Sequence, residues 1–221
     1  MKKQTVRFVT LMLVVSLLLW MVGSTTAEQA VTAARERMNA YQEVLLGKRT
    51  YTQCNLFDRT EQTALFSTGF TQWYGYDFNL PMKYTTFCIS DLDADGLPEM
   101  ILSLSDDFGF ELLRYENGIV YGFPFTYRAM EDITLEGDLY GSNGAADNEW
   151  YRVRFKADQM EQAVVCEMRS TDGGDPEHYW IGDREVTEDD YDAYCEQMKQ
   201  KARPVWLDFT VQNIQAVVSK F

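Results

Sequence analysis

The chain is poor in histidine and in basic residues. It has one histidine, His178, and 20 Lys and Arg against 34 Asp and Glu, which gives a net charge of −14. Because phosphate binding relies on Lys and Arg clusters, we expect no nucleic-acid partner. No GxxxxGK or GxGxxG motif is present to support nucleotide binding. A catalytic triad would need His178 as its base, and neither an HExxH nor a GxSxG motif is present to support hydrolase chemistry.

Cysteine is scarce as well, and the absence of a CxxC motif excludes the usual zinc and thiol-redox sites. The four cysteines are Cys54, Cys88, Cys166 and Cys195. Outside the cytoplasm they could form two disulfides, and proximity in the sequence favours Cys54 with Cys88 and Cys166 with Cys195. Free buried thiols are the alternative, because Cys88 and Cys166 lie within apolar runs.

Residues 1–27 have the order of a secretory signal peptide. Three basic residues precede the apolar run from Phe8 to Val22, and small residues follow up to Ala27, which allows cleavage before Glu28. The run is short for a membrane span, which needs about 20 apolar residues, although an uncleaved anchor stays an alternative. We therefore predict a single secreted or extracytoplasmic domain over residues 28–221, with 17 basic and 34 acidic residues and a net charge of −17. Only an uncleaved N-terminal segment would contact a membrane.

The hydrophobic pattern predicts an α+β fold. Apolar residues recur at steps of three and four over 29–46, from Tyr191 to about 202 and over 211–221, which predicts one N-terminal and two C-terminal helices. Thr187 followed by acidic residues is a typical start for the second of these helices. No linker divides the chain, so we expect the helices to pack on one antiparallel β-meander sheet of six to eight strands.

The region between residues 83 and 181 alternates short apolar runs with turn residues, as a meander requires. Asn117 and Gly118 between two such runs are a strong hairpin signal. Residues 48–82 are rich in aromatic side chains and are predicted to be irregular. The expected strands cover 84–90, 99–105, 110–115, 119–122, 132–140, 149–156, 161–169 and 178–181.

A calcium loop is predicted over Asp91–Glu99. Acidic residues stand at alternate positions around Gly96, where the chain must turn sharply and a positive φ is expected. Calcium takes six to eight oxygen ligands at about 2.3–2.6 Å, and a short loop supplies them when every second side chain points inward. The predicted ligands are the side chains of Asp91, Asp93, Asp95 and Glu99 and the carbonyl of Leu97.

This loop differs from an EF-hand, because the twelfth residue is Leu102 where an EF-hand has its bidentate glutamate. A predicted strand follows Glu99. The pattern DxDxDGxxE followed by a strand, over residues 83–105, resembles the loops of FG-GAP and VCBS repeats, as in integrin alpha-chain propellers. It is also similar to a segment of uncharacterised exported proteins of Gram-positive anaerobes. Residues 178–191 resemble the C-terminal end of the same proteins. The resemblance implies a calcium loop beside a strand; a propeller would need repeated copies, and this chain has one.

The favoured hypothesis is an exported, non-catalytic calcium-binding module whose Ca²⁺ is structural and which interacts with an envelope protein or a glycan. One alternative is a secreted carbohydrate-active hydrolase or glycan-binding protein, since glycoside hydrolysis needs only two carboxylates and aromatic side chains can stack on sugars. Another is a structural exported domain whose acidic turn binds nothing. No catalytic residue is predicted. The aromatic residues considered for sugar stacking are Trp73, Tyr74, Tyr76, Trp150, Tyr151, Tyr179 and Trp180.

Overall fold

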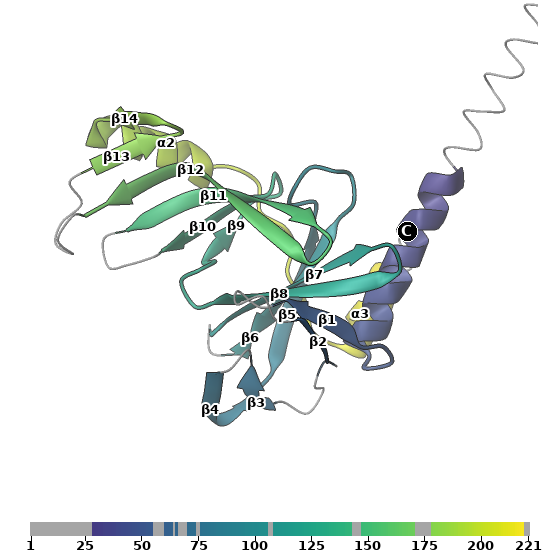
Figure 1. Ribbon diagram of the computed structural model, residues 1–221. Coiled ribbons are helices and arrows are strands. Elements are labelled where there is room, and N and C mark those ends of the chain that lie inside the picture. The colour runs from purple at the N-terminus through teal and green to yellow at the C-terminus, as the bar shows by residue number, and fades with distance from the viewer. Residues whose placement is uncertain are drawn as a thin grey trace, which may run out of the picture.

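The α+β class is confirmed by a computed structural model, which describes residues 28–54, 60–63, 65, 70–73, 76–105, 108–142, 147–170 and 178–218. This part of the chain contains three helices and two large, mostly antiparallel sheets (Figure 1). The predicted signal peptide lies outside the described residues.

The first sheet contains the predicted meander. Strands β5, β6, β7 and β8 pair in sequence order and are antiparallel throughout, and Asn117 and Gly118 both have positive φ (51° and 85°) at the β7–β8 turn. Strand β1 extends the sheet by pairing parallel to β8. The strand order is β15 (Leu207–Asp208), β5 (Tyr84–Ser90), β6 (Glu99–Leu104), β7 (Gly109–Glu116), β8 (Ile119–Thr126), β1 (Tyr51–Cys54) and β2 (Thr60–Thr63).

The second sheet is another antiparallel meander, so the strands divide between two sheets where one was expected. Its order is β14 (Arg184–Val186), β13 (His178–Ile181), β12 (Gln159–Arg169), β11 (Asn148–Lys156), β10 (Asp138–Ser142) and β9 (Asp132–Ile133). The single strand predicted over 132–140 is wrong, because a turn with Gly137 at φ 79° separates β9 from β10. The irregular structure predicted over 48–82 is also wrong in part, since β1, β2, β3 (Phe70–Trp73) and β4 (Tyr76–Met82) lie there.

Alternating side chains explain how the two sheets stack. In β6, Met100 and Leu102 face a core shared with the N-terminal helix, whereas Ile101 faces a core shared with the second sheet. Both faces of the first sheet are therefore buried, which accounts for the nearly continuous apolar run in β6. In β11, Tyr151 packs toward the first sheet and Trp150 packs toward α2 (Glu188–Lys199).

The helices cover the outer faces of this stack. The N-terminal helix, residues 28–45, packs with α3 (Val211–Val218) on the first sheet through Tyr41 and Ile214, and α3 is partly hidden behind this helix in Figure 1. Helix α2 lies on the second sheet, and its predicted N-cap is confirmed, since Thr187 Oγ1 accepts a hydrogen bond from Asp190 N at 3.3 Å. None of the helices in the described ranges combines the length and the apolar character of a membrane span.

Candidate metal centre

The predicted calcium loop forms the connection between β5 and β6. The carboxylate of Asp91 holds its backbone, because Oδ1 accepts from Asp95 N at 3.1 Å and Oδ2 accepts from Gly96 N at 2.9 Å. Gly96 has a φ of 82°, as predicted, and Ala94 has a φ of 57°, which the sequence did not indicate. Two left-handed residues within three positions turn the chain back sharply and bring Glu99 near Asp91.

Three of the predicted ligands converge. One carboxylate oxygen from each of Asp91, Asp93 and Glu99 lies within 4.8 Å of the other two, a spacing that one cation with ligands at about 2.3–2.6 Å can bridge. The side chain of Asp93 is only 7 % exposed, and its Oδ1 is buried without a hydrogen-bond partner among the described residues. Buried polar oxygens are nearly always paired, so this oxygen is one that a cation could use as a ligand.

The other two predicted ligands are placed differently. The carboxylate of Asp95 lies outside the converging group: Oδ1 accepts from Leu97 N at 2.7 Å, and Oδ2 accepts from Arg114 Nη2 at 2.9 Å. It shapes the loop rather than joining the three oxygens. The carbonyl of Leu97 as a ligand stays a prediction.

Arg114, on β7, is the residue that sequence reasoning missed. Its Nη1 donates to Glu99 Oε1 at 2.8 Å and to Asp93 Oδ2 at 3.2 Å, and the guanidinium lies 5.1 Å from the centre of the Phe155 ring. Burial alone would lower the pKa of Arg114, but the hydrogen bond to Asp95 and the surrounding acidic charges outweigh it and raise that pKa. A charged residue in the middle of the buried strand β7 needs a partner, and this need is the sequence signal from which the role of Arg114 could have been predicted.

The loop is a junction between several parts of the fold. Tyr41 of the N-terminal helix donates its hydroxyl to Pro98 O at 3.2 Å, and Phe155 N of β11 donates to Asp93 Oδ2 at 3.4 Å. Leu92 is buried in the core between the sheets, and a Cβ added to Gly137 would lie 2.1 Å from the Leu92 carbonyl oxygen. A cation bound here would therefore tie the helix layer and both sheets together.

Two carboxyl groups of the centre ionise less readily than exposed ones. Desolvation raises the pKa of Glu99 to about 8, although the Leu92 N–H and the charge of Arg114 oppose that shift. Desolvation also raises the pKa of Asp93 above its ordinary value. One guanidinium is thus insufficient to keep these carboxyl groups readily ionised, and a divalent cation would supply the missing charge.

The raised pKa of Glu99 predicts how stability depends on pH in the absence of metal. Between the unfolded pKa near 4.5 and the folded pKa of about 8, the folded protein keeps a proton that the unfolded chain has lost. Unfolding free energy should therefore fall as pH rises across this window, by at most about 1.4 kcal/mol per pH unit. Urea unfolding in chelator at pH 5, 6.5 and 8 measures this slope.

Glu99→Gln is the variant that isolates this effect. Below pH 4.5 both proteins are neutral at this position, so the wild type should lose stability relative to Glu99→Gln as pH rises toward 8. Saturating Ca²⁺ should flatten the wild-type slope, because the ion keeps Glu99 ionised. A stability difference between the two proteins that is the same at every pH would contradict this assignment.

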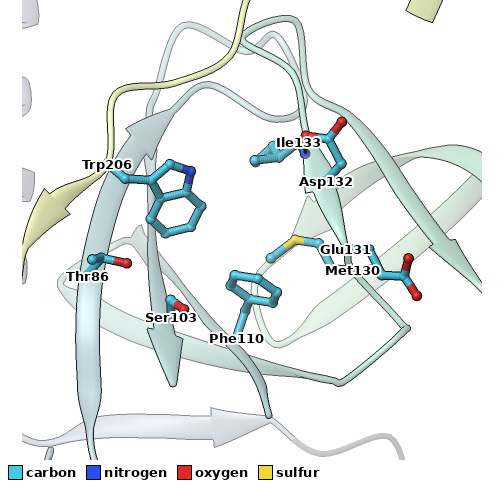
Figure 2. Close-up of a pocket in the computed structure, with 8 residues that line it drawn as sticks. All are labelled: Thr86, Ser103, Phe110, Met130, Glu131, Asp132, Ile133 and Trp206. Atoms are coloured by element: carbon cyan, nitrogen blue, oxygen red, sulfur yellow. Dashed lines mark hydrogen bonds between the residues drawn. The ribbon is translucent and has the colours of Figure 1, made fainter. Parts of the chain in front are cut away.

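Those aromatic residues considered for sugar stacking that the structure describes do not gather at one site. Trp150 and Tyr151 are buried in different cores, and the structure does not describe the side chains of Trp73, Tyr74 and Tyr76. A cavity of about 180 Å³ lies where the first sheet, β9 and the chain before β15 meet, with Trp206 and Phe110 in its wall (Figure 2).

Two carboxylates border this cavity, but they do not form a catalytic pair. In Figure 2 the carboxylates of Glu131 and Asp132 point away from each other, and Arg203 binds that of Asp132 at 2.7 Å. His178 is also engaged elsewhere: its ring stacks on Trp180, and Nδ1 lies 2.8 Å from Glu185 Oε1. No arrangement for glycoside hydrolysis is evident among the described residues.

All four cysteines are buried and have free thiols. Three strands separate β1, which carries Cys54, from β5, which carries Cys88, so their backbones are about 19 Å apart at ~4.8 Å per strand. The disulfide predicted between them is therefore wrong, because disulfides need Cα atoms within about 7 Å. Cys166 and Cys195 are not bonded either, but they share one core.

Comparison with known proteins identifies no relative of this chain. No protein-family model, no curated protein and no solved structure matches the chain. The functional argument therefore rests on the acidic centre and its surroundings.

Proposed function

We propose that this protein is an exported calcium-binding module in which Ca²⁺ is structural. Two observations carry the proposal: carboxylate oxygens of Asp91, Asp93 and Glu99 converge, and Asp93 has a buried Oδ1 without a hydrogen-bond partner among the described residues. Export is expected from the pattern of residues 1–27.

The donor chemistry favours calcium over other common cations. The converging group consists of carboxylate oxygens and contains neither the sulfur nor the nitrogen ligands that zinc prefers. Magnesium needs a near-ideal octahedron at about 2.0–2.1 Å, whereas calcium accepts irregular coordination at longer distances. Waters and the Leu97 carbonyl would complete the shell, since three carboxylates supply only part of six to eight ligands.

The position of the centre supports a structural role. Glu99 is fully buried and Asp93 nearly so, which leaves little room for a substrate to reach an ion between them. Binding would instead strengthen the junction of the N-terminal helix and the two sheets. Residues 94–97 are exposed beside the centre, and an envelope protein or a glycan would meet the molecule there.

Thermal unfolding in Ca²⁺, Mg²⁺ and chelator tests the proposal. A ligand at 100 times its Kd stabilises a protein by about 2.7 kcal/mol, which is worth about 5–10 °C in a domain of this size. We expect Ca²⁺ to raise Tm by that amount and Mg²⁺ to raise it much less. Glu161→Gln, which removes an exposed acid of β12, should respond like the wild type. Identical Tm values in Ca²⁺ and chelator would favour an acidic turn that binds no ion.

A further inference from the structure

We propose that the cavity of about 180 Å³ beside Trp206 binds a small neutral phenol, a single aromatic ring that carries a hydroxyl group. An apolar cavity of about 150 Å³ is enough to hold benzene, so the volume here suits one ring with a small substituent. The residues that line the cavity come from outside the loop Asp91–Glu99, and this inference therefore does not depend on the calcium centre (Figure 2).

The cavity lies where the face of the first sheet that packs toward the second sheet carries shorter side chains. Thr86, Ser103 and Phe110 are paired neighbours on β5, β6 and β7, and all three line the cavity. Two residues earlier on β6, the same face carries Ile101, which is completely buried in the core between the sheets. Because serine is much shorter than isoleucine, a space remains above Ser103.

The walls of this space supply the contacts that an aromatic ring needs. The rings of Phe110 and Trp206 are tilted by 44° with their centroids 5.9 Å apart, and both border the cavity in Figure 2. Met130 and Ile133 are buried and lie opposite Trp206. A ring between them gains packing against two aromatic side chains and against the methionine sulfur.

Two hydroxyl groups favour a phenol over a plain hydrocarbon ring. Thr86 and Ser103 are directly opposite each other in the β5–β6 register, and Figure 2 shows both hydroxyls on the same side of the cavity. Ser103 Oγ donates a long hydrogen bond of 3.4 Å to Leu104 O, which leaves this oxygen able to accept one. The phenol hydroxyl donates to Ser103 Oγ and accepts from Thr86 Oγ1 in the proposed complex.

The charges at the cavity favour a neutral ring over a charged one. Glu131 and Asp132 belong to the lining and no basic residue does, which disfavours an aromatic carboxylate. An aromatic cation lacks a counter-ion as well. Arg203 already binds both carboxylate oxygens of Asp132, and the carboxylate of Glu131 points away from the cavity in Figure 2.

Phenol titrated into the purified protein tests the proposal, with the indole N–H signals of the tryptophans followed by nuclear magnetic resonance. The signal that disappears in Trp206→Phe belongs to Trp206. We expect phenol to shift this signal saturably with a Kd of about 1 mM or lower and to leave those of Trp150 and Trp180 in place. Benzene lacks the hydroxyl, and benzoate and benzylamine carry opposite charges, so each should bind at least about 10-fold more weakly.

The variant Thr86→Val/Ser103→Ala removes both hydroxyls and nearly keeps the shape of the cavity. It should bind phenol about 10-fold more weakly and benzene no more weakly than the wild type does. Thr32→Ala is the control, because it removes an exposed hydroxyl from the N-terminal helix on the other face of the first sheet, and it should bind like the wild type. Circular dichroism verifies that each variant is folded, and the comparison of the four ligands needs only the wild type.

Three results would overturn the proposal. The first is a Trp206 signal that does not move at about 10 mM phenol, which is tenfold above the expected Kd. The second is binding of benzene, benzoate or benzylamine that is as tight as that of phenol. The third is a folded Thr86→Val/Ser103→Ala variant that binds phenol as the wild type does.

Discussion

Replacement of Arg114 by methionine is expected to cost about 3–5 kcal/mol of unfolding free energy in chelator at neutral pH. The guanidinium is buried and binds Asp93, Asp95 and Glu99 at once, so its loss leaves carboxyl groups of the loop without their hydrogen-bond donor. Methionine keeps much of the packing against Phe155, which separates the loss of charge from a loss of volume. Urea unfolding measures the difference.

Arg154→Met is the matched control, because Arg154 is an exposed arginine on β11 of the second sheet. It should change stability by less than about 0.5 kcal/mol. Calcium should restore part of what Arg114→Met loses, since the ion supplies positive charge to the same oxygens. If Arg114→Met costs no more than Arg154→Met, the guanidinium does not hold the loop in solution.

Replacement of Asp93 by asparagine is expected to weaken Ca²⁺ binding by at least about 100-fold. Asp93 contributes both a charge and the buried, unpaired Oδ1, whereas asparagine keeps the shape and loses the charge. Asp95→Asn is the comparison, because Asp95 holds the loop and Arg114 from outside the converging group. It should weaken binding by about 10-fold, the lower end of the cost of losing an outer-shell partner.

Calorimetric titration of the wild type and the two variants measures this order. An equal loss of Ca²⁺ affinity in Asp93→Asn and Asp95→Asn would mean that the acidic residues of the loop contribute equally to binding, as the alternating pattern alone suggests. Unchanged heat in Asp93→Asn would place any bound Ca²⁺ elsewhere on this acidic protein.

The elements that the sequence predicted are those specified by local pattern. The three helices have apolar stripes, the β7–β8 turn has Asn117–Gly118, and α2 begins at the Thr187 cap. The predicted strand over 132–140 was wrong because Gly137 interrupts it with a left-handed turn, and a lone glycine does not by itself distinguish a turn from a bulge. The division into two sheets depends on long-range packing, which periodicity does not encode.

In the candidate site, too, the local sequence pattern predicted the residues of the loop, whereas the residue placed by the tertiary fold was missed. Asp91, Asp93 and Glu99 are close in sequence, so their spacing predicted that they meet. Arg114 comes from a strand two along the chain, and its position depends on the register of β7 against β6. That guanidinium neutralises part of the charge that the isolated loop pattern assigns to calcium, and it binds Asp95, which lies outside the converging group.

A crystal structure of residues 28–221 grown with Ca²⁺ is the most direct test of the calcium centre, with anomalous scattering from a lanthanide in a second crystal to identify the site. We expect one ion bonded to oxygens of Asp91, Asp93 and Glu99 at about 2.3–2.6 Å, with Arg114 retained beside it. A structure at millimolar Ca²⁺ in which Asp93 Oδ1 contacts only protein or water, with no ion in the loop, would contradict the account.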